Sequence, residues 1–173
     1  GVVIRKSIKS AGDRFDEAIV KYVRLKHRIM IGEKTAEDLK INIGCAYKDA
    51  RESSYIMKGR NLVTGLPDQV EITSEEIREA LKEPVYAIIE SIKTTLEKTP
   101  PELAADIIEK GIIMTGGGSL LYGLDKLIEV NTGLNVKIAE NSVEAVVEGT
   151  GQVLNYINKL QFDDSGNEIS LIE

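Results

Sequence analysis

The sequence predicts an α/β fold organised as two subdomains. Short apolar runs alternate with longer segments whose apolar residues recur every three to four positions, which is the pattern of strands followed by helices. In the middle of the chain, helices together with short strands and turns interrupt this regular alternation. A glycine-rich turn at residues 115–119 stands directly between a short apolar strand and a helix.

Composition places the chain among soluble cytosolic globular proteins. Its 173 residues are 42% hydrophobic, which is enough to build a real core. The formal charge of −6 and the pI near 5.0 argue against a nucleic-acid partner, which usually requires a basic surface. The single cysteine, Cys45, cannot form an internal disulfide and favours a reducing compartment. Neither a secretory signal nor a membrane-spanning run is visible.

The amino-terminal part predicts a strand over residues 2–8 and two helices. Asp13 is placed to cap the first helix. The second helix runs from about Thr35 to Ala46. The apolar stripe of the first helix comprises Phe15, Ala18, Ile19, Tyr22 and Val23.

Short strands and turns are predicted between residues 53 and 72, before a long helix. Thr73 and Glu76 have the spacing of a capping box, so the helix should begin there. Pro84 falls inside the apolar stripe of this helix and predicts a kink or an early break.

The carboxy-terminal part returns to regular alternation. A short helix opens at Pro100 and Pro101 and should end at Gly111, because glycine favours the left-handed exit conformation. A strand at 112–114, a helix from 120 to about 133, a strand at 136–138 and a last helix from about 141 to 157 follow. The acidic tail at 161–173 is predicted to be flexible or loosely docked. We therefore expect residues 1–32 and 99–160 to share one sheet subdomain, with 33–98 forming a smaller inserted subdomain.

The strongest chemical signal is the run Thr-Gly-Gly-Gly-Ser at residues 115–119. Glycines between a strand and a helix let the backbone approach a ligand, and the helix amino terminus offers unpaired N–H groups. The spacing matches neither the phosphate loop nor the dinucleotide fingerprint. A tight strand-to-helix turn without a ligand is the alternative, and we favour the ligand-facing turn.

Several motifs in the same order resemble MreB, the bacterial actin homologue, in its carboxy-terminal half. They are Ala-Gly-Asp-Arg-Phe-Asp-Glu-Ala-Ile at 11–19, Ile-Gly-Glu-Lys-Thr-Ala-Glu at 31–37, Gly-Arg-Asn-Leu at 59–62, Gly-Leu-Pro at 65–67, Pro-Pro-Glu-Leu-Ala-Ala-Asp at 100–106, Ile-Met-Thr-Gly-Gly-Gly-Ser-Leu-Leu at 113–121 and Ala-Glu-Asn at 139–141. The resemblance reaches about residue 160. It implies the second half of an actin-like, ribonuclease-H-like ATPase fold, with the smaller α+β subdomain inserted.

The resemblance also implies where an adenine nucleotide would bind. Gly117, Gly118, Ser119 and Leu120 would border the adenine and ribose. Glu37 and Lys40 would approach from the helix on the other side, with Glu37 accepting from ribose hydroxyls and Lys40 lying along the nucleoside. Gly12 would lie near the cleft. The alternative for Glu37 and Lys40 is an ordinary solvated ion pair on a helix surface.

The resemblance implies a filament-forming protein that sets bacterial cell shape. The family binds ATP or ADP with magnesium, polymerises with itself and contacts the RodZ-type membrane adaptor. Its membrane contact comes through the other half, so we expect a cytoplasmic location at the inner face of the membrane. The two phosphate-holding hairpins of actin-like ATPases are not in this sequence. We therefore expect the parent protein to be an ATPase, whereas this chain should have no catalytic or metal site and should bind ATP weakly at best. Half of another actin-fold ATPase, such as a sugar kinase or a heat-shock chaperone, is the alternative.

Overall fold

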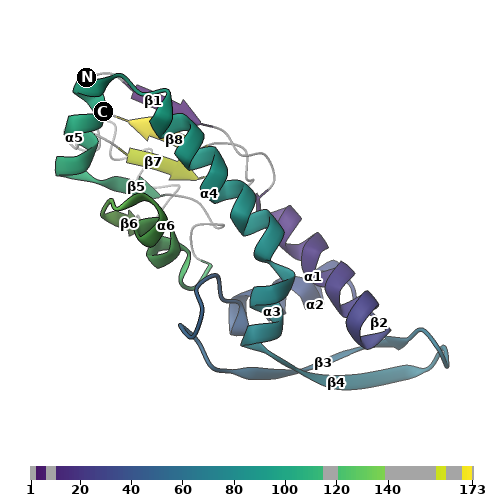
Figure 1. Ribbon diagram of the computed structural model, residues 1–173. Helices are drawn as coiled ribbons and strands as arrows, with labels where there is room; N and C mark the ends of the chain where they lie inside the picture. The colour runs from purple at the N-terminus through teal and green to yellow at the C-terminus, as the bar shows by residue number, and fades with distance from the viewer. Residues whose placement is uncertain (1–2, 7–10, 115–120, 139–158, 163–168, 173) are drawn as a thin grey trace, which may run out of the picture. The chain divides into compact units, whose positions relative to one another are not determined.

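The computed structural model describes residues 3–6, 11–114, 121–138, 159–162 and 169–172 (Figure 1). The chain divides into two compact units. The first, here called the terminal unit, contains residues 1–12, 86–120 and 124–173. The second, the hairpin unit, contains residues 13–85 and 121–123. Each unit combines segments that are distant in the sequence.

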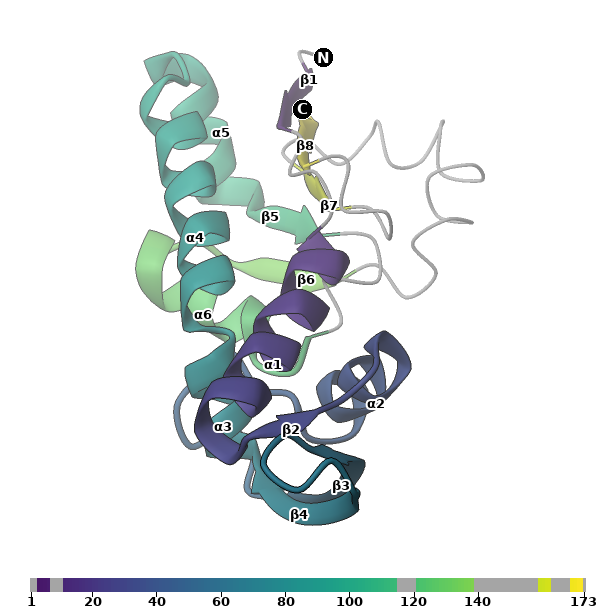
Figure 2. The same ribbon diagram turned by 90° about the vertical axis from the view of Figure 1, so that its right-hand side faces the viewer.

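The hairpin unit is built around an antiparallel sheet of order β2-β3-β4. A long hairpin forms most of it, with Ser54 paired to Thr73 at one end and Arg60 paired to Pro67 at the other (Figure 2). The short strand β2 adds to the other edge of β3, where Met30 pairs with Arg60. In chain order the elements are α1 (Ala11–His27), β2 (Ile29–Met30), α2 (Glu33–Ile43), β3 (Ser54–Asn61), β4 (Pro67–Thr73) and α3 (Ser74–Ala80).

The core of the hairpin unit comes from one face of each helix and from inward strand positions. The apolar stripe of α1 buries Phe15, Ile19 and Val23 completely. The helix α2 contributes residues at the same spacing of three to four. The other buried side chains of this unit include Ile29, Ala36, Leu39, Ile43, Met57, Ile72, Ile77 and Leu81. The periodicity in the sequence therefore identified the buried face of α1, where Phe15, Ile19 and Val23 are buried and Ala18 and Tyr22 are half-buried.

The terminal unit contains a parallel pair and an antiparallel sheet. Strands β5 and β6 are parallel, with Ile112 paired to Val136, and α6 lies between them in the chain. Strand β8 pairs antiparallel with both β1 and β7. The elements are β1 (Val3–Lys6), most of α4 (Lys82–Glu97), α5 (Pro101–Lys110), β5 (Ile112–Met114), α6 (Leu124–Thr132), β6 (Val136–Ile138), β7 (Lys159–Phe162) and β8 (Ile169–Ile172).

Three local signals act as the sequence predicts. The Thr73 side chain accepts from the Glu76 N–H, and the Glu76 carboxylate accepts from the Thr73 N–H, which completes the capping box of α3. The helix breaks at Leu81, so that Pro84 falls in the first turn of α4, where a missing N–H costs nothing. Gly111 ends α5 with φ 83° and donates its N–H to the Ile107 carbonyl at 2.8 Å.

Several boundaries differ from the prediction. Helix α2 begins at Glu33, not Thr35, and ends at Ile43, because Gly44 adopts an extended conformation instead of continuing to Ala46. The first boundary between the two units falls after residue 12 and not after residue 32, because most of α1 belongs to the hairpin unit. The second boundary falls after residue 85 and not after residue 98. Residues 169–172 form a strand within the tail that is predicted to be flexible, because they pair antiparallel with both β1 and β7. The predicted last helix at 141–157 lies outside the described residues.

Candidate functional site

Helix α2 presents two of the residues that the sequence singles out. Its buried face, which includes Ala36 and Leu39, fixes the rotation of the helix. Glu37 is exposed, and the side chain of Lys40 is only 17% exposed. The two residues are one turn apart on the same side of the helix. The helix thus offers a solvent-accessible carboxylate beside a largely covered ammonium group.

Lys40 forms an ion pair with a residue of another helix. Its Nζ lies 2.8 Å from Oδ1 of Asp16, which projects from α1. The side chain of Asp16 is 16% exposed, so most of this pair is removed from water. A pair of this kind holds both side chains in one geometry, unlike a mobile pair on an open surface. The simple alternative for Lys40, a solvated helix-surface residue, therefore does not describe its position.

Two further carboxylates influence Asp16, the partner of Lys40. Burial raises the pKa of Asp16 above its usual value, while the bond and the positive charge of Lys40 lower it. Glu37 and Asp13 raise the pKa of Asp16 further through charge repulsion, so both carboxylates lie close enough to influence it. Asp16 therefore has one cationic partner and two anionic neighbours.

The end of α2 is held by hydrogen bonds from Gly44 and Arg51. Gly44 donates its N–H to the Lys40 carbonyl at 3.0 Å, which closes the last turn. Arg51 Nη1 donates to the carbonyl oxygens of Ile41 and Gly44, each at 3.3 Å. The Arg51 guanidinium also lies 5.2 Å from the centre of the Tyr122 ring. These contacts fix the helix from which Glu37 and Lys40 project.

The structure brings together only part of the predicted nucleotide site. Gly117, Gly118, Ser119 and Leu120 lie outside the described residues. Gly12 is half-buried in the first turn of α1. Glu37 and Lys40 both project from α2, and Lys40 pairs with Asp16 of α1, which the sequence pattern did not single out. The sequence does contain a signal for Asp16, which precedes the buried residues Ile19 and Val23 by three and seven positions. This spacing places Asp16 on the buried face of α1, where a carboxylate needs a cationic partner.

The other candidate sites are separate from this group. A polar pocket of about 510 Å³ contains none of the predicted residues, and Asp49, Arg51, Glu52, Ser53, Ser54, Thr73, Ser74 and Glu75 line it. Among the residues that the structure describes, no group of three or more histidine, cysteine or acidic side chains is arranged to hold a metal ion. Cys45 is buried, and its Sγ donates to the Tyr47 carbonyl at 2.9 Å.

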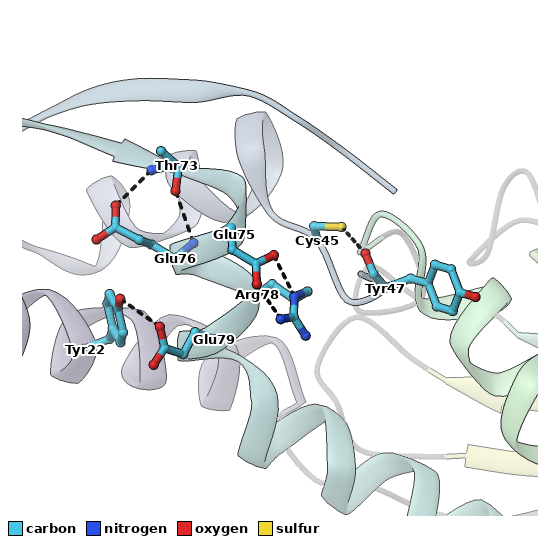
Figure 3. A network of polar contacts seen from close by, with 8 residues as sticks. All are labelled: Tyr22, Cys45, Tyr47, Thr73, Glu75, Glu76, Arg78 and Glu79. Atoms are coloured by element: carbon cyan, nitrogen blue, oxygen red, sulfur yellow. Dashed lines mark hydrogen bonds and ion pairs between the residues drawn. The ribbon is translucent and has the colours of Figure 1, made fainter. Parts of the chain in front are cut away.

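A second polar network joins α1 to α3, and Figure 3 shows its contact between Tyr22 and Glu79 and the capping box of α3. Besides capping α3, the Glu76 carboxylate places Oε1 2.7 Å from His27 Nε2. The Tyr22 hydroxyl donates to Glu79 Oε2 at 3.3 Å. Arg78 binds Glu75 with two nitrogen atoms, one of them at 2.9 Å. His27, the chain's single histidine, is thus a structural partner of the capping carboxylate.

We expect Tyr22 to make the hairpin unit lose stability at alkaline pH. Burial, together with the Glu76 and Glu79 carboxylates, raises the pKa of Tyr22 to about 12. The unfolded phenol ionises near pH 10, so the contribution of Tyr22 is complete below that pH and is lost as the pH rises toward 12. Urea unfolding across this range should show a smaller fall for Tyr22→Phe than for the unchanged chain. Tyr86→Phe, at an exposed tyrosine, should behave like the unchanged chain; equal slopes for all three would contradict the assignment.

Comparison with known proteins identifies the chain's relatives. The family model for the MreB/Mbl proteins matches residues 1–162. The chain belongs to the MreB/Mbl family. It is 47% identical over 159 residues to the cell shape-determining protein Mbl of Bacillus cereus, covering 92% of this chain and 48% of that protein. It is 45% identical over 158 residues to the cell shape-determining protein MreB of Escherichia coli, covering 91% and 46%. The chain thus spans about half the length of these MreB/Mbl relatives.

Solved structures of the MreB/Mbl family share the fold. MreB5 of Spiroplasma citri bound to AMPPNP is 45% identical, with a TM-score of 0.77 over 83% of this chain and 43% of that one. The same protein has also been solved bound to ADP, with a TM-score of 0.78. A MamK double helical filament is 23% identical, with a TM-score of 0.63, which shows the fold alone. The chain therefore has part of the actin-like α/β fold, and the family match rules out the sugar-kinase and chaperone alternatives.

Proposed function

We propose that this chain is the carboxy-terminal, nucleoside-holding half of a cell-shape filament protein. The observation that carries this proposal is the group formed by Glu37, Lys40 and Asp16 in a chain 45% identical to a relative solved with AMPPNP and with ADP. The glycine turn at 115–119 supports it from the sequence. The segments 1–12 and 86–162 would form most of the ribonuclease-H-like subdomain, and the hairpin unit the smaller inserted one.

The charge distribution fits the nucleoside part of an adenine nucleotide better than its phosphates. Two carboxylates, Asp13 and Glu37, act on Asp16, and this negative charge would disfavour a phosphate group nearby. The Glu37 carboxylate is exposed and does not cap a helix, so it can accept hydrogen bonds from ribose hydroxyls. Lys40 would lie along the nucleoside, and Gly117, Gly118, Ser119 and Leu120 would border the adenine and ribose. Phosphate and magnesium contacts would come from the other half of the protein, so this chain alone should bind nucleotide weakly and should not hydrolyse it.

Replacing Glu37 by alanine tests the ribose contact. The change should cost about 1–3 kcal/mol of binding free energy, since it removes a charged acceptor from a hydroxyl. Binding of ADP at millimolar concentration can be followed by NMR chemical shifts of the α2 backbone, beside thermal unfolding of the same sample. An exposed ion-pair residue would instead change either quantity by only about 0–1 kcal/mol.

Glu33→Ala provides the matched control for this experiment. Glu33 is also exposed, lies one turn earlier on α2 and carries the same charge. Its removal should leave ADP binding nearly unchanged. Equal effects of the two variants on ADP binding would mean that Glu37 is an ordinary solvated surface residue without a ribose contact. Sub-micromolar ATP affinity of this chain by calorimetry would contradict the division of the cleft between two halves.

The full-length protein would assemble ATP-regulated filaments from copies of itself. We propose that it hydrolyses ATP in step with polymerisation, at the inner face of the cytoplasmic membrane. A RodZ-type adaptor would bind it, and lipid contact would belong to the other half. Within the described part of the chain, no helix is both long and apolar enough to cross a bilayer.

A further inference from the structure

We infer that Asp16 is a positioning residue of the nucleoside site, acting through Lys40. This inference rests on the proposed function, because it presumes that Lys40 faces the nucleoside. Asp16 would hold the lysine ammonium in one place before the ligand arrives. The nucleoside would then meet a donor that is already oriented, and binding would not have to immobilise a long flexible side chain.

The geometry of the pair supports this role. The two residues come from different helices, α1 and α2, and their charged atoms are 2.8 Å apart. Both side chains are mostly covered, at 16% exposure for Asp16 and 17% for Lys40. The Asp16 oxygen in the pair is a buried atom. Lysine has four rotatable side-chain bonds, so contact with a fixed carboxylate strongly restricts the position of its ammonium group.

Burying the Asp16 carboxylate has a cost that its pair with Lys40 offsets only in part. Burial is the largest influence on the Asp16 carboxyl, and it outweighs the attraction of Lys40, so the pKa of Asp16 is raised. Asp13 and Glu37 raise this pKa further through repulsion. The pair therefore adds little net stability, and its geometry permits a further role in fixing the position of the Lys40 ammonium group.

A double-mutant cycle on this chain separates positioning from structure. The variants are Asp16→Asn, Lys40→Met and their combination, where methionine keeps the apolar stem of lysine without its charge. Adenosine is the probe, at millimolar concentration, with binding read from NMR chemical shifts and stability from urea unfolding. Asp16→Asn should weaken adenosine binding by about two- to tenfold, because Lys40 must then be ordered by the ligand. In the Lys40→Met background, the same change should leave adenosine affinity unaltered and should raise stability.

Glu17→Gln is the matched control. It removes one negative charge from the position next to Asp16 on α1, and Glu17 is exposed. This variant should keep the adenosine affinity of the unchanged chain. Equal affinity for Asp16→Asn and the unchanged chain would overturn the positioning role while leaving the site intact. A loss of affinity from Asp16→Asn that persists in the Lys40→Met background would show a merely structural role. Absence of any adenosine-dependent shift in the unchanged chain would overturn the proposed site itself.

Discussion

Truncating Phe15 to alanine should cost about 3–5 kcal/mol of unfolding free energy, the typical loss for a buried aromatic ring. Phe15 is fully buried at the start of the apolar stripe of α1. The cavity left by its ring cannot be filled without moving the helix that also carries Asp16. A loss of this size is a large fraction of the stability of a domain. Urea unfolding followed by circular dichroism would measure it.

Leu25→Ala is the control on the same helix. Leu25 is 67% exposed, so its truncation should change the unfolding free energy by no more than about 0.5 kcal/mol. Both variants introduce alanine into the same helix, and the replaced apolar residues differ chiefly in burial. A similar cost for both variants would mean that helix propensity, and not core packing, holds α1 in place.

Adding a single methyl group at Gly59 should be the next most damaging change. A Cβ at this position would lie 2.4 Å from the Met30 carbonyl oxygen and 2.6 Å from a methyl carbon of Ile29. Because one of the two atoms belongs to the backbone, strand β2 would have to move away from β3. Overpacking of this kind costs about 1–3 kcal/mol. Gly59→Ala should therefore lower the unfolding free energy and reduce amide exchange protection in β2.

Lys58→Ala is the control for this second experiment. It introduces the same alanine one position earlier in β3, where the side chain is exposed on the opposite face of the sheet. The unfolding free energy should change by no more than about 0.5 kcal/mol. Unchanged exchange protection in β2 of Gly59→Ala would show that the strand tolerates the methyl group, contrary to the expected clash.

The features that the sequence predicts well depend on neighbouring residues. The buried face of α1, the capping box at Thr73, the break before Pro84 and the end of α5 at Gly111 each follow from residues within one or two turns. Strand β2 has only two residues, and it exists because β3 pairs with it from far along the chain. A two-residue run carries no periodicity, so no local pattern could reveal it.

The candidate site shows the same limit. Glu37 and Lys40 could be selected because they share one turn of one helix. The partner of Lys40 could not, since Asp16 is on another helix, and only the packing of α1 beside α2 brings the charges together. The glycine turn was chosen for its composition, and its role stays a prediction. An acid in line with a buried stripe is the one signal that would have pointed to Asp16.

The Glu76 carboxylate connects α1 and α3, two helices of the hairpin unit that are far apart in the chain, through hydrogen bonds. One oxygen closes the capping box of α3 and the other meets His27 at the end of α1. Opening the first turn of α3 would therefore break the contact with the last turn of α1. We expect this shared carboxylate to couple the local unfolding of the two helix ends. Helix α1, which carries Asp16, is thereby tied at its far end to the base of the long hairpin.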